Sequence, residues 1–215
     1  MGGSEQIQTR SATSAPREPR HWTWLSALTA TRVGLAAGLF FLVQVAWFTY
    51  PNEYAATLAT LLDADPFRAP AHPVWQFLLG LLLKLPGFSP SAVAGLLNAV
   101  CGALVVGLMF AVSSRVRLRR SKSRTKQARF DAETAEARQL AGLLSALYTV
   151  VSLPLLIVFT RQHPLALSAL LGLLALWLTQ RALLQPSRVT WLIFCGVYGL
   201  GCAEWPTFFL LSPLF

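Results

Sequence analysis

The chain has 215 residues, of which 54% are hydrophobic and only 13% are charged, and its formal net charge is +9. Soluble domains carry about 25% charged residues, so this composition excludes an ordinary soluble domain. Several apolar runs reach about 20 residues, the length needed to cross a hydrocarbon core of about 30 Å. We therefore expect an all-α polytopic membrane protein with about five transmembrane helices.

The N-terminal half contains one expected span and a long outer loop. Residues 1–30 are polar and rich in Ser, Thr, Pro and Arg, which predicts a disordered tail. The first span is expected at 33–50, and the outer loop covers 51–91. Within this loop, 74–85 is apolar but only about a dozen residues long. That length is too short to cross a bilayer and predicts an interfacial or re-entrant helix.

Four further spans are expected at 92–112, 140–159, 165–178 and 191–211. Pro154 predicts a kink in the third span, because proline removes a helical hydrogen bond and clashes with the preceding turn. Pro206 predicts a break near the end of the fifth span. Residues 113–139 are expected to form a basic loop between the second and third spans.

The distribution of basic residues predicts the orientation. All but three of the 18 Lys and Arg residues fall on the side of the N-terminal tail and loop 113–139; the exceptions are Arg68, Lys84 and Arg161. By the positive-inside rule, this side is cytoplasmic. We expect a multi-pass protein of the inner (plasma) membrane with a cytoplasmic N-terminus. If 74–85 crossed the membrane, loop 113–139 would lie outside and the bias would largely disappear.

The basic residues from Arg115 to Arg129 form a block that contains no acid. The block is either a topology determinant alone or also a binding surface for anionic lipid headgroups. A nucleic-acid partner is not expected, because no aromatic side chains interleave with these charges to stack on bases.

Three acids of the first outer loop, Glu53, Asp63 and Asp65, are candidate catalytic groups. Glu53 opens an expected short helix over 53–62. Asp65 precedes Pro66 and is therefore extended, and an extended Asp63 would place both carboxylates on one side. Paired carboxylates bind a divalent cation or act as a general base. The alternative is a solvated loop whose acids only keep it outside.

Four residues elsewhere are candidate substrate contacts. His72 precedes Pro73 at the expected start of the short helix, where exposed N–H groups favour anions such as phosphate. Arg161 and His163 lie in a tight outer turn, and Arg161 can pair with phosphate. Glu204 lies in the fifth apolar span, where a carboxylate is costly and is a functional candidate. The alternatives are a capping histidine, an interfacial anchor and a hydrated carboxylate.

This order of features resembles the GT-C glycosyltransferases, and most closely their protein O-mannosyltransferase-like branch. In that branch an acidic Asp-Ser-Gly-Glu-like motif follows the first span, and a His-Pro-Pro-Gly motif comes later in the loop. Here Ala71-His72-Pro73-Val74 stands at the second position, and Asn98 lies early in the next span. Residues 85–87, 95–99 and, more loosely, 198–201 continue the likeness. It covers residues 33–211, and its specific part is 50–112.

The resemblance implies transfer of a mannose-type sugar from a polyprenyl-phosphate donor on the outer face. A first-loop acid would act as the general base or hold a metal, and basic groups would hold the donor phosphate. The chain departs from the pattern, because Thr57 and Thr60 stand where the family's acids are expected. The second Pro and the Gly after His72 are also missing. The family usually has more spans, so we expect a fragment or one member of an assembly.

The leading interpretation makes residues 31–215 a GT-C-like glycosyltransferase domain with the three loop acids as catalytic groups. Asp63 and Asp65 are then the candidate ligands of a divalent cation, and the partners are the bilayer, a polyprenyl-phosphate lipid and other membrane proteins. The main alternative is a non-catalytic GT-C-like subunit of a larger membrane complex. A transporter is the third hypothesis, for which the chain shows no paired broken helices or inverted repeat.

Overall fold

The computed structural model describes residues 27–47, 72–84, 86–87, 89–115, 127–160, 163–205 and 207–210. Within these ranges the chain forms seven α-helices and no strand, which confirms the all-α class. The helices are, in chain order, α2 (Ala30–Trp47), α4 (Pro73–Leu82), α5 (Pro90–Ser113), α6 (Gln127–Val151), α7 (Leu153–Thr160), α8 (Leu165–Leu184) and α9 (Arg188–Glu204).

Two of these helices, α5 and α8, are long and apolar enough to cross a membrane. The pair α6 and α7 provides a third candidate if it is one broken span, since the two helices meet at 68°. The polytopic class is therefore supported by two or three described helices, and the count of about five stays a prediction. The segment expected at 74–85 forms α4, a helix of 10 residues, which is shorter than a membrane-spanning helix.

Two boundaries differ from those expected. Residues 127–139, assigned above to a basic loop, form the first half of α6. This segment is rich in Ala, Glu, Arg and Gln, which favour helix even where the chain is polar. The bend between α6 and α7 falls at Ser152, two residues before Pro154. The proline ring cannot donate a helical hydrogen bond to the preceding turn, which explains the bend there.

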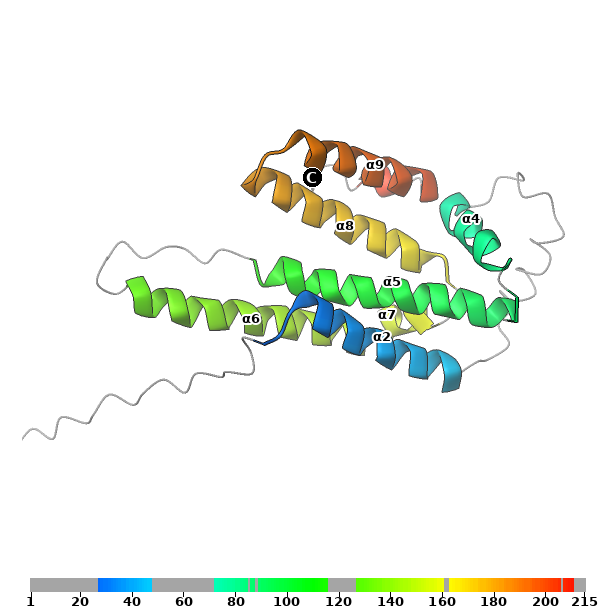
Figure 1. The fold of residues 1–215 in the computed structure, drawn as a ribbon, viewed down its shortest axis with the longest axis horizontal. Coiled ribbons are helices and arrows are strands. Elements are labelled where there is room, and N and C mark those ends of the chain that lie inside the picture. Colours follow the sequence, from blue (N-terminus) through cyan, green and yellow to red (C-terminus); the bar gives the residue numbers. More distant parts are fainter. Residues whose placement is uncertain are drawn as a thin grey trace, which may run out of the picture.

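Helix α5 is the central helix of the bundle. It contacts α2, α4, α6, α7 and α8, and the remaining helix, α9, packs against α8 and α4 (Figure 1). The long helices lie side by side, whereas α4 covers one end of the bundle beside the ends of α5, α8 and α9. This end, called the α4 end below, is the one that the charge distribution predicts to face outward.

Small residues allow α2 and α5 to approach closely. A Cβ added to Gly34 would lie 3.0 Å from the Ala103 carbonyl oxygen, and one added to Gly107 would lie 2.9 Å from the Ala30 carbonyl oxygen. Helices in lipid gain little from apolar burial against each other, so close backbone contact through glycine is a main source of their association. The contact between α2 and α5 therefore depends on these two glycines.

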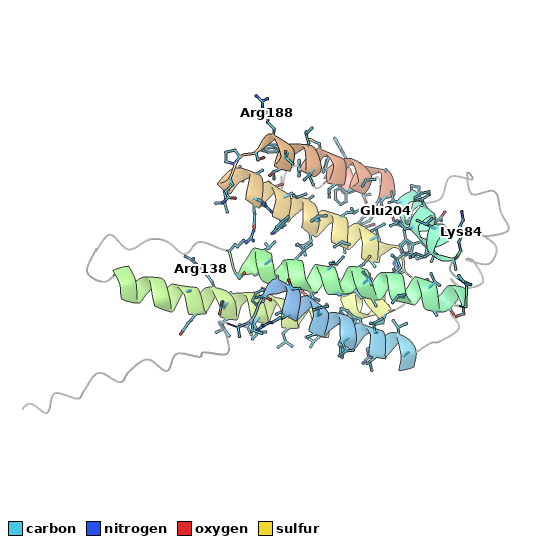
Figure 2. All side chains as sticks on the ribbon, viewed as in Figure 1. Lys84, Arg138, Arg188 and Glu204 are labelled. Atoms are coloured by element: carbon cyan, nitrogen blue, oxygen red, sulfur yellow. The ribbon has the colours of Figure 1, made fainter. Side chains whose placement is uncertain are left out.

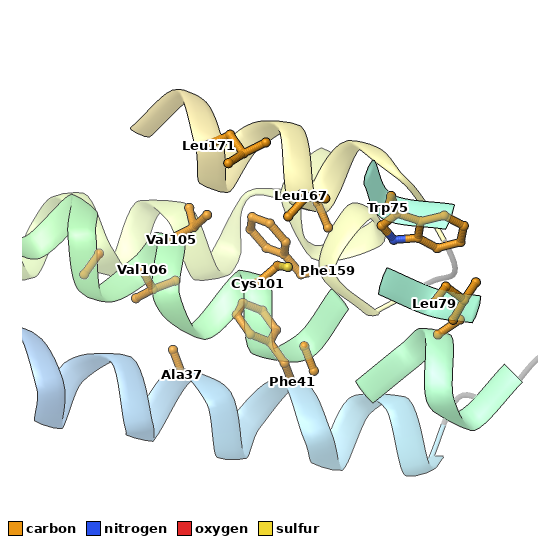
Figure 3. Packing of buried hydrophobic residues seen from close by; sticks show 14 of the residues in the cluster. Ala37, Phe41, Trp75, Leu79, Cys101, Val105, Val106, Phe159, Leu167 and Leu171 are labelled. Carbon is orange, nitrogen blue, oxygen red and sulfur yellow. The ribbon is translucent and has the colours of Figure 1, made fainter. Parts of the chain in front are cut away.

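Two phenylalanines fill the space where α2, α5 and α7 meet. Phe41 and Phe159 are fully buried, and their ring centroids are 5.4 Å apart (Figure 3). Both rings press on α5 at Gly102, where an added Cβ would lie 2.7 Å from Cγ of Phe159 and 2.9 Å from Cε2 of Phe41. The absence of a side chain at Gly102 therefore admits both rings into the core.

We predict that Gly102→Ala lowers the free energy of unfolding by about 1–3 kcal/mol, the usual cost of overpacking a core. Gly196→Ala is the matched control, because nothing lies within 4 Å of its added Cβ. That control should be neutral or slightly stabilising, since alanine favours helix over glycine. Thermal unfolding of the purified protein in detergent, followed by circular dichroism, measures both changes. Equal melting temperatures for the two variants would contradict this account of the core.

Candidate functional site

The polar residues of the α4 end converge on the N-terminus of α4. The first helical residue, Pro73, has no N–H, and the N-cap residue, His72, makes no side-chain capping hydrogen bond. The N–H groups of Val74 and Trp75 therefore need an acceptor from elsewhere, because the first turn of a helix offers none. A helix N-terminus also carries partial positive charge, so a carboxylate is a favourable acceptor there.

Glu204, the last residue of α9, provides that carboxylate (Figure 2). Its Oε2 accepts hydrogen bonds from the Val74 N–H at 2.8 Å and from the Trp75 N–H at 2.9 Å. The side chain is fully buried, although it is ionisable. A buried carboxylate is tolerated when it is hydrogen-bonded and faces opposite charge. Glu204 thus caps α4 from a position 130 residues away along the chain.

The second oxygen of Glu204 faces His72. Oε1 lies 3.3 Å from Nδ1 of His72, whose side chain is 16% exposed. This distance is that of a polar contact, but the orientation of the two groups is not that of a hydrogen bond. Neither atom makes a hydrogen bond to any other residue that the structure describes. Buried polar atoms are normally hydrogen-bonded, so the close approach of these two atoms without a hydrogen bond makes them candidate contacts for a polar ligand group.

A relay of hydrogen bonds joins α4 to two further segments. The buried indole Nε1 of Trp75 donates to Oδ1 of Asn98 at 3.1 Å, and Nδ2 of Asn98 donates to the backbone carbonyl of His163 at 3.0 Å. Asn98 is fully buried in α5, and His163 lies between α7 and α8. The relay fixes the distance between the start of α4 and the turn that precedes α8.

The imidazole of His163 caps α8. Its Nδ1 accepts the N–H of Leu165 at 3.2 Å, so in the neutral ring the proton is on Nε2. Burial lowers the pKa of His163 below its ordinary value. Burial also lowers the pKa of His72, and the neighbouring His163 adds to this, while Glu204 acts in the opposite direction. Both imidazoles are therefore neutral near pH 7 and act as hydrogen-bonding groups rather than cations.

Of the seven candidate residues, three are described and lie at the same end of the bundle: His72, His163 and Glu204. The other four, Glu53, Asp63, Asp65 and Arg161, lie outside the described residues. No group of three or more His, Cys, Asp or Glu side chains suited to a metal occurs among the described positions, so the two aspartates remain the candidate metal ligands only by prediction. The helix N-terminus assigned above to a phosphate holds the Glu204 carboxylate.

Trp75 was not predicted from the sequence, and Asn98 was predicted only as part of the resemblance. One signal was available, because Asn98 is a polar residue inside an otherwise apolar helix. Such residues in membrane helices usually form hydrogen bonds across helices. The pairing of Glu204 with α4 had no local signal, since the two lie far apart in the sequence.

Comparisons with known protein families, with curated proteins and with solved structures found no match.

We predict that Glu204→Ala lowers the free energy of unfolding by about 2–5 kcal/mol, because it leaves two backbone N–H groups of α4 without an acceptor. Glu204→Gln should cost less, since the amide oxygen can still accept while the attraction between charge and helix dipole is lost. Gln76→Ala, a change on the partly exposed side of α4, is the control and should be near neutral. Chemical unfolding in detergent micelles, monitored by tryptophan fluorescence, gives these values. A Glu204→Ala variant as stable as the Gln76→Ala variant would refute the capping role.

Proposed function

We propose that the chain is a membrane glycosyltransferase-like protein that transfers a mannose-type sugar from a polyprenyl-phosphate donor to an acceptor hydroxyl on the outer face. The observation that carries this proposal is the buried Oε1 of Glu204, which faces Nδ1 of His72 without a hydrogen bond to a described residue. A buried polar pair of this kind, at the end of the bundle and beside the outer loop, is suited to a hydroxyl-rich or phosphate-bearing substrate.

The length of the connecting chain allows the candidate acids to reach this pair. Asp65 precedes His72 by seven residues and Asp63 by nine. An extended chain covers at most about 3.6 Å per residue, so the two acids lie within about 25 Å and 32 Å of His72 respectively. The other end of the loop is also at the α4 end, because α2 ends there (Figure 1). Glu53 follows Trp47, the last residue of α2, by six residues.

The proposed reaction assigns different work to these residues. A first-loop carboxylate, Glu53 first and Asp63 or Asp65 next, takes the proton of the acceptor hydroxyl. The acceptor oxygen forms a bond to the anomeric carbon of the sugar, and the bond from that carbon to the phosphate oxygen breaks. Arg161 pairs with the donor phosphate, and neutral His72 contributes a hydrogen bond. Glu204 is a positioning residue that holds α4, and with it His72. A divalent cation on Asp63 and Asp65 would neutralise the leaving phosphate.

The membrane arrangement belongs to the same proposal. Helices α2 and α9 join α5, α8 and the bent pair α6–α7 as about five spans of the inner membrane, with the N-terminus and the basic segment after α5 in the cytoplasm. A cysteine introduced by Ser121→Cys should therefore react with a maleimide in intact cells only if the reagent crosses membranes. Reaction with an impermeant maleimide would reverse the orientation.

The catalytic proposal predicts turnover of a polyprenyl-phosphate mannose donor by the purified, reconstituted protein. Loss of a general base costs about 100-fold to 10,000-fold in rate, so one of Glu53→Gln, Asp63→Asn or Asp65→Asn should show a loss of that size. Asp131→Asn is the control, because it lies in the first half of α6, at the far end from α4. Radiolabelled sugar released from the donor measures the rate. Full activity in all three loop variants would remove this mechanism.

A non-catalytic subunit of a larger membrane complex is the second candidate. It is favoured by the complete use of Glu204 Oε2 in capping α4, which is a structural role. Large exposed apolar side chains along α9, including Leu192, Ile193 and Leu200, would suit contact with lipid or with another membrane protein. No turnover by an intact, correctly assembled protein would favour this second candidate over the enzyme.

A further inference from the structure

A long apolar groove runs along one face of the bundle between α2 and α5. Its volume is about 720 Å³, and it is lined by residues from Ala30 to Leu42 on α2 and from Ala99 to Ala111 on α5. Leu35, Leu39, Val100 and Leu104 line it and are more than two-fifths exposed. The glycines that join α2 to α5 form its floor, and these leucines and valine form its walls.

One end of this groove carries positive charge. Arg115 and Trp177 complete the lining there, at the end of α5 opposite α4. The Arg115 guanidinium carbon lies 5.7 Å from the centre of the Trp177 ring, and that of Arg181 lies 5.4 Å from it. Neither guanidinium pairs with a carboxylate among the described residues. Two exposed guanidinium groups beside one ring, with no carboxylate partner among the described residues, favour binding of an anionic group between them.

The dimensions of the groove match one leaflet of a bilayer. From Ala30 to Leu42 the rise along α2 is about 18 Å, at 1.5 Å per residue. Half of a hydrocarbon core of about 30 Å is about 15 Å. A chain lying in the groove would thus extend from the membrane surface to near the midplane. Tryptophan is enriched at membrane–water interfaces, which agrees with Trp177 marking the headgroup level.

We propose that the groove between α2 and α5 binds an anionic phospholipid of the leaflet on the Arg115 side, with one acyl chain along the groove and the headgroup phosphate between Arg115 and Arg181. Charge complementarity selects this occupant. A zwitterionic lipid would bring its own cation to the arginine pair, and a neighbouring apolar helix would leave both arginines without a counter-ion. Trp177 and Arg181 also line a second groove of about 500 Å³ between α8 and α9, which offers room for the second chain.

This site is distinct from the candidate catalytic site, since it lies at the other end of the bundle and shares no residue with it. The site also favours one of the two interpretations of the basic block from Arg115 to Arg129, since its first residue would bind lipid as well as determine topology. Arg115 is the first residue of that block. The proposed lipid site does not depend on glycosyltransferase activity.

Native mass spectrometry of the full chain in detergent tests the proposal, with phosphatidylglycerol and phosphatidylcholine titrated separately. Phosphatidylglycerol should bind more tightly, and added salt should weaken it. Each arginine in contact with the headgroup phosphate should contribute about 1 kcal/mol, so the double variant Arg115→Ala/Arg181→Ala should bind phosphatidylglycerol about 30-fold more weakly. Arg115→Lys/Arg181→Lys, which keeps both charges, should retain most of the affinity.

Two matched controls separate the groove from general charge and folding effects. Arg188→Ala removes an exposed cation at the same end, outside both grooves (Figure 2), and should leave binding unchanged. Val100→Trp fills the groove and should abolish retention of one phosphatidylglycerol, whereas Leu96→Trp, one turn earlier and outside the groove, should not. Melting temperatures of all variants exclude unfolding as the cause of lost binding.

Several outcomes would overturn the assignment. Equal binding of the two lipids would remove the charge argument, and unchanged binding by the double alanine variant would remove the arginine pair. Tighter binding of a polyprenyl phosphate than of phosphatidylglycerol would assign the groove to a different lipid. A stable dimer that excludes lipid, and that Val100→Trp disrupts, would assign it to a second copy of the chain.

Discussion

The carboxylate of Glu204 accepts hydrogen bonds from the first N–H groups of α4. The other polar contacts at the α4 end are arranged around that interaction. α4 has only 10 residues, so it cannot be held by crossing the bilayer. Its buried residues Trp75 and Leu79 fix one face, but a helix whose first turn has no capping side chain needs an acceptor for its N–H groups. Because that acceptor comes from the end of α9, α4 and α9 are joined directly.

The bundle beneath this end depends on α5. Its small residues admit α2, and its Gly102 admits Phe41 and Phe159. Its Asn98 carries the hydrogen-bond relay from Trp75 to the turn at His163. The same helix therefore determines the positions of both candidate sites, since Asn98 lies at the α4 end and Arg115 at the opposite end. A shift of α5 relative to α8 would disturb the relay and the arginine pair together.

The sequence predicts the helices better than it predicts the contacts between them. Apolar length located α5 and α8, and Pro154 located the bend, because these signals depend only on local chain chemistry. The start of α4 also followed from Pro73. The polar segment 127–139 was assigned to a loop, because its charges concealed a helix that continues into the apolar half of α6. The sequence predicts about five spans, whereas the described helices support two or three. The difference includes α2 and α9, which have only 18 and 17 residues.

For the candidate site, the residue types in the sequence indicated which residues to consider. They did not indicate which of these residues contact each other. His72 was selected because a helix N-terminus favours anions, and Glu204 because a carboxylate in an apolar segment is costly. Nothing local indicated that one would face the other, or that Glu204 would take the place assigned to a phosphate. The role of Trp75 was not visible in the sequence, because a tryptophan in an apolar helix is most simply a core residue and its indole N–H finds Asn98 only in the folded bundle.

Amide hydrogen exchange over α4 tests most directly whether Glu204 holds this end together. If it does, the amides of Val74 and Trp75 in the reconstituted protein exchange slowly, because both are hydrogen-bonded to a buried carboxylate. In Glu204→Ala the same two amides should exchange far faster, while the central amides of α5 keep their protection. Fast exchange of Val74 and Trp75 in the unaltered protein, or equal exchange in both proteins, would contradict the account.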